Sequence, residues 1–206
     1  MAFQTVWYET EMPDKLIDII IEDLNNQNYK FDESRINGDR IDKKIRNSKN
    51  SWVDTSHWVG GLIWHYVMRA NRENFLYDIT CVDSESIQYT SYSEGEYYNW
   101  HVDSDIDSYY KPEFIHESGK FDTMQDASYV NNEYVRKLSF IVQLSDPDEY
   151  KGGEVQLLDN TSKSYFIPKI KGTVAIFDSR TRHRVKKVRS GNRKSLVGWV
   201  VGPRFK

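Results

Sequence analysis

The sequence predicts a mainly β fold with flanking α-helices, a β-sandwich or jelly-roll barrel supported by helices on one face. Helical spacing of apolar residues occurs before residue 75 of the 206-residue chain. From about Ser86 onward, short β-rich runs alternate with turn signals such as Ser-Glu-Gly-Glu, Lys-Gly-Gly and Ser-Gly-Asn. Many short strands that follow two helices are typical of this architecture.

Two helices are expected in the first part of the chain. Pro13 and Asp14 indicate the start of a helix over residues 13–26, because proline is tolerated in the first turn. Its apolar residues recur at helical spacing: Leu16, Ile17, Ile20, Ile21 and Leu24. A second helix is expected around residues 58–74, with core contacts from Leu62, Val67 and Met68. The polar stretch 27–50 between them predicts surface connections.

Eight strands are expected after the helices, at residues 86–92, 98–103, 137–144, 153–158, 164–167, 173–177, 182–188 and 194–201. The length fits one domain over residues 1–206, in which residues 1–80 form a helical support. The long polar stretch 104–135 shows no clear periodicity and begins directly after candidate metal ligands. It is interpreted as a lid or as a solvated insertion.

Composition and charge limit the kinds of binding partner and the cellular compartment that are expected for this protein. The formal net charge of −3 gives no indication of a nucleic-acid partner. No apolar run approaches the roughly 20 residues that span a bilayer, and no leader precedes the domain, so a cytoplasmic location without membrane association is expected. The single cysteine, Cys81, rules out an internal disulfide and is expected to be a buried structural thiol.

A candidate metal site combines residues from two of the predicted strands. His101 and Asp103 lie at positions i and i+2 of a strand, whose side chains project to the same face. A His-x-Asp pair alone is common, and His183 is the strongest candidate for a third ligand. Two imidazoles and one carboxylate form the facial triad of Fe(II) oxygenases, which leaves positions for a chelating cosubstrate and oxygen.

Arg193 lies ten residues beyond His183, after a turn at Ser-Gly-Asn. The turn would fold the next strand back beside the one that carries His183, so that Arg193 points into the same cavity. A guanidinium there suits the distal carboxylate of a dicarboxylate ligand, and Ser195 on the same face could add a hydroxyl. Alternatively, Arg193 is one exposed member of a basic surface cluster.

Several motifs in order resemble one family. The chain has Tyr-x-x-Gly-x-x-Tyr-x-x-His-x-Asp over residues 92–103 and Leu-Ser-Asp-Pro-Asp-Glu-Tyr-x-Gly-Gly-Glu over residues 144–154. His-Arg-Val over residues 183–185 and Arg193 follow. Together they resemble the prolyl-4-hydroxylase-like branch of the 2-oxoglutarate oxygenases, and most closely the PKHD-type hydroxylases. The resemblance covers roughly residues 86–202.

The resemblance implies a double-stranded β-helix, a jelly-roll and cupin-like core over residues 86–202, with Fe(II) at its open end. The cofactors implied are Fe(II), 2-oxoglutarate as cosubstrate and O2. By the same resemblance, Tyr92 lies close to the 2-oxoglutarate, and Tyr98 and Trp199 line the substrate side. For these last two residues, core packing is the competing interpretation.

The function expected is hydroxylation of an unactivated C–H bond, with a prolyl residue of a protein or peptide as the substrate. A hydroxylase of a free amino acid or another small molecule is an alternative. A non-catalytic, cupin-like metal-binding module would not need Arg193, and a zinc hydrolase would use the three ligands with a bound water. No basic aromatic groove supports repair of nucleic acids, and the sequence does not indicate the oligomeric state.

Overall fold

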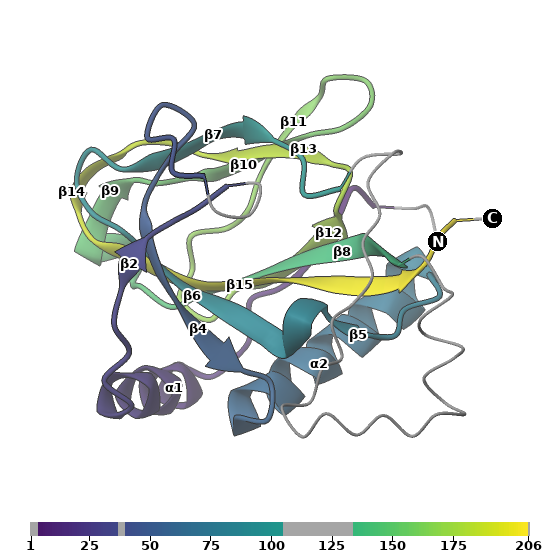
Figure 1. Cartoon of the computed structure of the whole chain (residues 1–206), viewed down its shortest axis with the longest axis horizontal. Coiled ribbons are helices and arrows are strands. Elements are labelled where there is room, and N and C mark those ends of the chain that lie inside the picture. Colours follow the sequence, from purple (N-terminus) through teal and green to yellow (C-terminus); the bar gives the residue numbers. More distant parts are fainter. Residues whose placement is uncertain (1–3, 37–39, 105–133, 206) are drawn as a thin grey trace.

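Two antiparallel β-sheets face each other in the computed structural model of the chain, which describes residues 4–36, 40–104 and 134–205 (Figure 1). The larger sheet has the order β1 (Val6–Glu9), β12 (Val174–Asp178), β8 (Tyr134–Gln143), β15 (Arg193–Pro203), β6 (Ser86–Tyr92), β4 (Lys49–Asp54) and β2 (Asp32–Glu33). The short strand β5 (Cys81–Val82) also pairs with β15.

The smaller sheet has the order β11 (Ser164–Phe166), β10 (Val155–Leu158), β13 (Arg182–Val185), β7 (Tyr97–His101) and β3 (Arg46–Asn47). A two-stranded ribbon of β9 (Tyr150–Gly152) and β14 (Val188–Gly191) lies at one end of the two sheets (Figure 1). Helices α1 (Asp14–Asn26) and α2 (Trp58–Ala70) lie on the side of the larger sheet away from the smaller one (Figure 1). The predicted fold class, mainly β with flanking helices, is confirmed.

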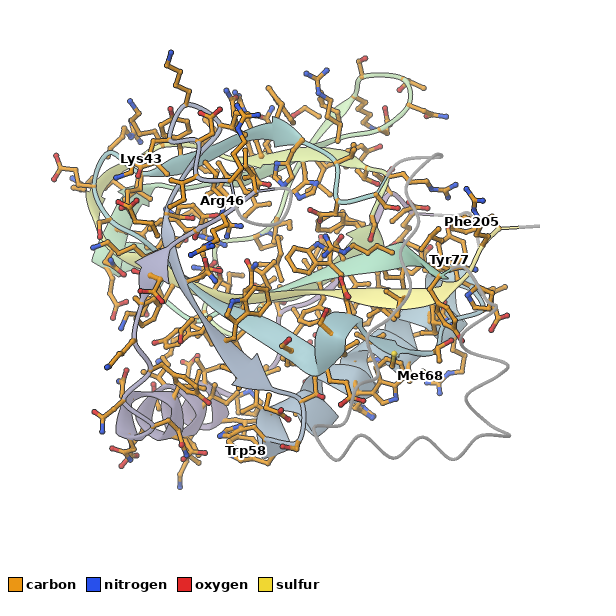
Figure 2. All side chains as sticks on the ribbon, in the orientation of Figure 1. Lys43, Arg46, Trp58, Met68, Tyr77 and Phe205 are labelled. Carbon is orange, nitrogen blue, oxygen red and sulfur yellow. The ribbon has the colours of Figure 1, made fainter. Side chains whose placement is uncertain are left out.

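The alternation of side chains along β8 produces two separate cores, because successive residues of a strand point to opposite faces. Leu138, Phe140 and Val142 belong to the core that the larger sheet shares with the two helices. Ile141 belongs to the second core, between the sheets. Side chains fill both layers (Figure 2). The face of the larger sheet that looks toward the smaller one is also where polar residues of β8 and β15 gather.

Both helices meet the sheet through one apolar stripe, as their spacing predicts. Ile17, Ile20 and Leu24 are the buried residues of α1 that pack on the sheet. In α2 the buried face runs through Val59, Ile63 and Val67, and Met68, expected in the core, is 44% exposed. Successive side chains of a helix are about 100° apart around its axis, so Met68, which follows the buried Val67, lies outside the buried face.

The structure corrects the expectation for residues 27–50, which are not only surface connections. They include β2, β3 and the start of β4, and Arg46, Ser48 and Asn50 are buried. The α-helical part of the expected second helix ends at Ala70, and a π-helical turn follows over Asn71–Phe75. The chain also has an additional edge strand, β1, that the sequence did not indicate.

Other expectations differ in detail or cannot be compared. The expected strand 182–188 is divided into β13 and β14. Cys81 is half-buried rather than buried, and burial, with the charges of Glu85 and Asp83, raises the pKa of its thiol to about 11. Almost all of the proposed lid, at residues 105–133, lies outside the described residues. No helix of the described chain is long and apolar enough to cross a membrane.

Adjacent glycines of α2 provide a matched test of this packing. A Cβ atom added at Gly60 would lie 2.2 Å from the carbonyl oxygen of Thr55, whereas one at Gly61 meets nothing within 4 Å. We expect Gly60→Ala to lower the free energy of unfolding by about 1–3 kcal/mol, since overpacking forces the backbone to move. Gly61→Ala should raise it by up to about 1 kcal/mol through helix propensity. Urea unfolding measures both, and equal stability of the two variants would contradict this packing.

Candidate metal centre and adjoining cavities

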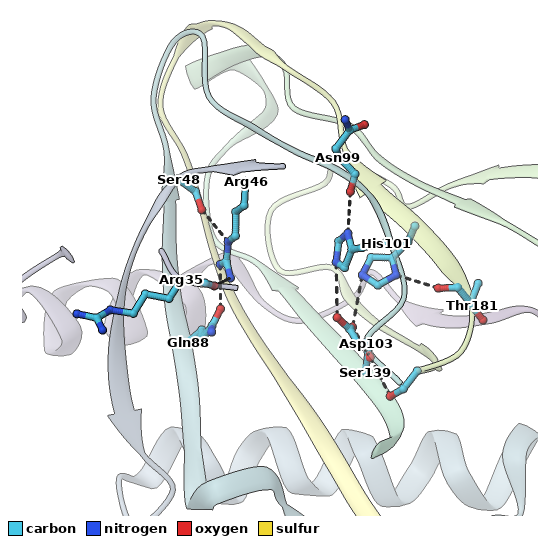
Figure 3. A network of polar contacts seen from close by, with 11 residues as sticks. Arg35, Arg46, Ser48, Gln88, Asn99, His101, Asp103, Ser139 and Thr181 are labelled. Carbon is cyan, nitrogen blue, oxygen red and sulfur yellow. Dashed lines mark hydrogen bonds and ion pairs between the residues drawn. The ribbon is translucent and has the colours of Figure 1, made fainter. Parts of the chain in front are cut away.

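Three candidate metal ligands converge at β7 and β13, which are neighbours in the smaller sheet, and at the bend that follows β7 (Figure 3). β7 pairs with β13 so that His101 lies directly opposite His183. Asp103 brings its carboxylate between them, with Oδ1 3.5 Å from His101 Nε2 and Oδ2 3.4 Å from His183 Nε2. One ligand atom from each residue falls within 4.8 Å of the others. The three residues therefore lie close enough to bind one ion.

Asp103 does not lie within a strand, as the sequence suggested. β7 ends at His101, and the chain then bends so that the backbone N–H of Asp103 donates to Ser179 O at 2.9 Å. This hydrogen bond to the loop before β13 turns the carboxylate back toward the imidazoles. His101 and Asp103 thus lie close together, as their i, i+2 spacing predicts. Their proximity results from a bend after β7, which the hydrogen bond to Ser179 O stabilises.

Backbone carbonyls orient both imidazole rings. His101 Nδ1 lies 2.7 Å from Asn99 O, and His183 Nδ1 lies 2.9 Å from Thr181 O (Figure 3). A carbonyl oxygen can only accept, so each Nδ1 carries the proton and each Nε2 keeps its lone pair. Such contacts to the second ring nitrogen are the usual way in which a protein orients a histidine ligand.

Ser139 holds the carboxylate from the opposite sheet. Its hydroxyl donates to Asp103 Oδ2 at 2.7 Å and lies 3.0 Å from Ser179 Oγ. Ser139 is 1% exposed, in an otherwise apolar run of β8. A serine within such a run was the sequence signal for this contact, and it was missed.

The electrostatics of the site favour a cation. Burial lowers the pKa of His183 to about 4, against the opposing effect of the Asp103 charge, so that its imidazole is neutral at pH 7. Burial alone would raise the pKa of Asp103, but His183 and His101, in their protonated forms, and the Ser139 hydroxyl together hold it well below its usual range. Two imidazoles beside a carboxylate are the donor set that Fe(II) takes in oxygenases, so these residues fit that metal.

Arg193 lies in a cavity that also contains the three candidate ligands. Its side chain is buried, its Nη1 donates to Ser195 Oγ at 3.2 Å, and its guanidinium lies 5.7 Å from the centre of the Tyr92 ring. Among the described residues it forms no ion pair with a carboxylate. We call this space the inner cavity. A guanidinium in this state suits a carboxylate of a bound ligand.

A second cavity of about 530 Å³ adjoins the first and is called the outer cavity. Residues common to the walls of both are Arg46, Gln88, Tyr98, Asp103 and Trp199. The Tyr98 ring stacks on His101 with 3.5 Å between ring centres, and Arg136 lies 3.9 Å from the centre of a Trp199 ring. The ligand cluster is thus reached from both cavities.

The sequence-derived site residues have the following positions. Tyr92, Tyr98, His101, Asp103, His183, Arg193 and Trp199 all line the inner cavity. Ser195 is fully buried beside Arg193 and is not among the lining residues. Arg46, Gln88 and Arg136 were not assigned to the site from the sequence, and Arg46 lies in the stretch 27–50 that was expected to form surface connections.

Comparison with known families and proteins gives one consistent result. The model of the 2OG-Fe(II) oxygenase superfamily matches residues 87–201. A PKHD-type hydroxylase of Synechococcus sp. (strain CC9311) is 37% identical over 84 residues, which are 41% of this chain and 37% of that protein. Another, of Prochlorococcus marinus, is 43% identical over 65 residues, or 31% of this chain and 28% of that protein. The matched segments thus span less than half of these relatives.

Solved structures share the fold at low sequence identity. A Pseudomonas putida prolyl-4-hydroxylase has a TM-score of 0.67 at 13% identity and covers 97% of this chain and 93% of its own. A viral collagen prolyl hydroxylase from Paramecium Bursaria Chlorella virus-1, solved as a 2OG complex, has a TM-score of 0.63 at 20% identity, with 97% of both chains covered. A Trichoplax adhaerens prolyl hydroxylase in complex with a hypoxia inducible factor peptide fragment has a TM-score of 0.67 at 16% identity, covering 95% of this chain and 83% of its own.

Removal of the Ser139 hydroxyl tests the role of the opposite sheet in metal binding. We expect Ser139→Ala to raise the Kd for Mn(II) or Fe(II) by about tenfold or more, because a carboxylate ligand that loses its hydrogen bond is less well oriented. Anaerobic isothermal titration of the metal measures this. The matched control is Ser86→Ala, whose hydroxyl donates to Ser84 O at the protein surface. Equal metal affinity in the two variants would mean that Ser139 does not position the ligand.

Proposed function

Because this chain belongs to the 2OG-Fe(II) oxygenase superfamily, we propose that it is a 2-oxoglutarate-dependent dioxygenase that hydroxylates a prolyl residue of a protein or peptide. The observation that carries this proposal is the convergence of His101, Asp103 and His183, with ligand atoms within 4.8 Å, in the cavity that also holds Arg193. A facial triad beside a buried guanidinium that lacks a carboxylate partner is what a chelating dicarboxylate cosubstrate requires.

Fe(II) would be held by His101 Nε2, His183 Nε2 and one oxygen of Asp103. The Nδ1 contacts to Asn99 O and Thr181 O fix the rings with their lone pairs available. Ser139 binds Oδ2 of the carboxylate, which favours coordination through a single oxygen and leaves positions for other ligands. Three protein ligands, rather than four, suit a catalytic metal.

2-Oxoglutarate would lie in the inner cavity with its distal carboxylate on Arg193. Ser195 Oγ, which accepts from Arg193 Nη1, would hold the guanidinium in place for that carboxylate. Tyr92 lies opposite Arg193 in the pairing of β6 with β15 and lines the cavity. A Cβ atom at Gly153 would lie 3.1 Å from Arg193 Cδ, so this glycine leaves room for the arginine side chain.

When bound, iron and 2-oxoglutarate would supply the oxidative chemistry: O2 converts 2-oxoglutarate to succinate and CO2 and places its other oxygen atom in a substrate C–H bond. The chain itself excludes water around the site through Ile141, Val185 and Val197, which line the inner cavity. Tyr98 and Trp199 stand at the boundary with the outer cavity and would orient the substrate carbon.

A peptide is supported as the substrate by the outer cavity and by the comparisons. The cavity is wide, has a volume of about 530 Å³ and reaches Asp103 directly. Solved structures that share this fold include prolyl hydroxylases, and one was solved with a peptide fragment bound. The apolar rings of Tyr98 and Trp199 are suited to contact a proline ring.

Cosubstrate binding can be tested without knowledge of the substrate. Titration of the anaerobic protein with Fe(II) and then 2-oxoglutarate should produce a visible charge-transfer band of the chelate. We expect His183→Ala to abolish the band and Arg193→Ala to require about 10- to 100-fold more 2-oxoglutarate, since a charge-assisted pair is lost. The control is Arg69→Gln, on the distant helix α2. A folded wild-type protein without the band would contradict the proposal.

The prolyl substrate needs a separate test. Incubation with Fe(II), ascorbate, 2-oxoglutarate and a set of proline-containing peptides should give products heavier by one oxygen atom, located on proline by tandem mass spectrometry. Trp199→Ala should raise the KM for the peptide by about tenfold or more, because a large aromatic contact is removed, and the KM for 2-oxoglutarate by a smaller factor, because Arg193 still binds its distal carboxylate. Oxidation of free amino acids alone, with no peptide turned over, would assign the small-molecule alternative.

A further inference from the structure

Arg46 is a buried cation whose hydrogen-bond partners are all neutral. It is 6% exposed and lies at the start of β3, at the boundary of the inner and outer cavities. Its Nε donates to Ser48 Oγ at 3.0 Å, its Nη2 to Gln88 Oε1 at 3.0 Å, and its Nη1 to Arg35 O at the long distance of 3.5 Å (Figure 3). No carboxylate of the described chain pairs with it.

The acidic residues of the outer cavity are engaged elsewhere or lie at its exposed rim. Glu33 pairs with Lys43, and Asp32 is exposed. Asp103 directs its oxygens to the two imidazoles and Ser139. Arg136, another arginine of this wall, is neutralised by Asp83 at 2.7 Å. Arg46 is therefore a cation of the cavity wall that retains capacity for an anion.

A buried guanidinium without a counter-ion is energetically costly, and proteins retain such a group where a ligand supplies the charge. The Tyr98 ring, 4.8 Å from the guanidinium carbon, offsets only part of this cost. Arg193 shows the same pattern in the inner cavity, with a hydroxyl as partner and no carboxylate. One bound 2-oxoglutarate has one distal carboxylate, which accounts for Arg193 and leaves Arg46 for a different anion.

A second, independent donor points to the same place. Trp199 is only 9% exposed, lines both cavities, and its indole Nε1 has no hydrogen-bond partner among the described residues. A buried N–H without a partner is energetically costly, so a ligand acceptor at this position would be stabilised. Gln88, which turns its Oε1 to Arg46, adds an amide nitrogen that can only donate. The wall that the two cavities share thus carries one charged donor, Arg46, and two neutral donors, Gln88 and Trp199.

We propose that Arg46, together with Trp199 Nε1 of the same cavity wall, binds a carboxylate of the substrate, so that the preferred substrate is acidic close to the carbon that is hydroxylated. This inference rests on the proposed function, since it assigns the outer cavity to the substrate. The carboxylate comes either from the end of a chain, as in a C-terminal or free proline, or from an acidic side chain next to the target residue. Arg46 is a specificity-determining residue in both cases.

The test uses the Zn(II)-substituted protein loaded with 2-oxoglutarate, which does not turn over, and two pairs of probes. N-acetylproline and N-acetylprolinamide differ in charge at the chain end, and acetyl-Glu-Pro-amide and acetyl-Gln-Pro-amide differ in charge on the neighbouring side chain. The indole N–H signal of Trp199, assigned with Trp199→Phe, reports binding by NMR. We expect at least one acid to shift this signal and to bind about tenfold or more tightly than its amide.

Variants separate a charge effect from a general loss of structure. Arg46→Gln should remove the preference for the acid, Arg46→Lys should retain part of it, and Arg69→Gln should leave it unchanged. Unfolding temperature and 2-oxoglutarate affinity, measured on each variant, verify that the fold and the inner cavity are intact. Amides that bind as tightly as acids, or no response to any probe in a protein that binds 2-oxoglutarate, would overturn the inference while the proposed function stands. A wild-type protein that does not bind 2-oxoglutarate would remove both.

Discussion

The antiparallel pairing of β7 with β13 is the constraint on which the rest of the site depends. This register sets His101 opposite His183, with 4.1 Å between the ring centres, although the two residues lie far apart in the sequence. Asp103 can join them only because the loop before β13 accepts its backbone N–H through Ser179 O. That loop is in turn tied to the larger sheet, where the N–H of Ser179 donates to Lys137 O. The positions of the three candidate metal ligands therefore depend on contacts that join both sheets.

Sequence patterns predicted the parts of this protein that local chemistry determines. Helical spacing located Asp14–Asn26, and alternation with turn signals located strands such as β6. The ligand residues could be selected because few residue types bind Fe(II), and Arg193 because a turn returns its strand to the same end. Ser139 and Arg46 could not be selected from the sequence, because their contacts depend on the register between strands or on a distant segment of the chain. Met68 was misplaced because one residue of helical rotation decides its exposure.

The two buried arginines give the cavities a common electrostatic design. Arg193 and Arg46 have neutral protein partners, so each guanidinium is oriented in advance and keeps its charge for a ligand. Both lack the hydration that stabilises the charge of a surface arginine. Glycine at 153 and the buried hydroxyl of Ser195 show that the space around Arg193 is set by small residues. If both arginines bind anions as proposed, the selectivity for these anions would arise from burial as well as from charge.

The shared wall of the two cavities has a consequence for evolution. Tyr98, Asp103 and Trp199 line both cavities, so a substitution at any of them alters the walls of both. Rim residues such as Trp52 and Val102 line only the outer cavity, so they can vary without altering the lining of the inner one. In relatives that acquire new substrates, we accordingly expect substitutions first at residues that line only the outer cavity. The residues that line both cavities should change more slowly.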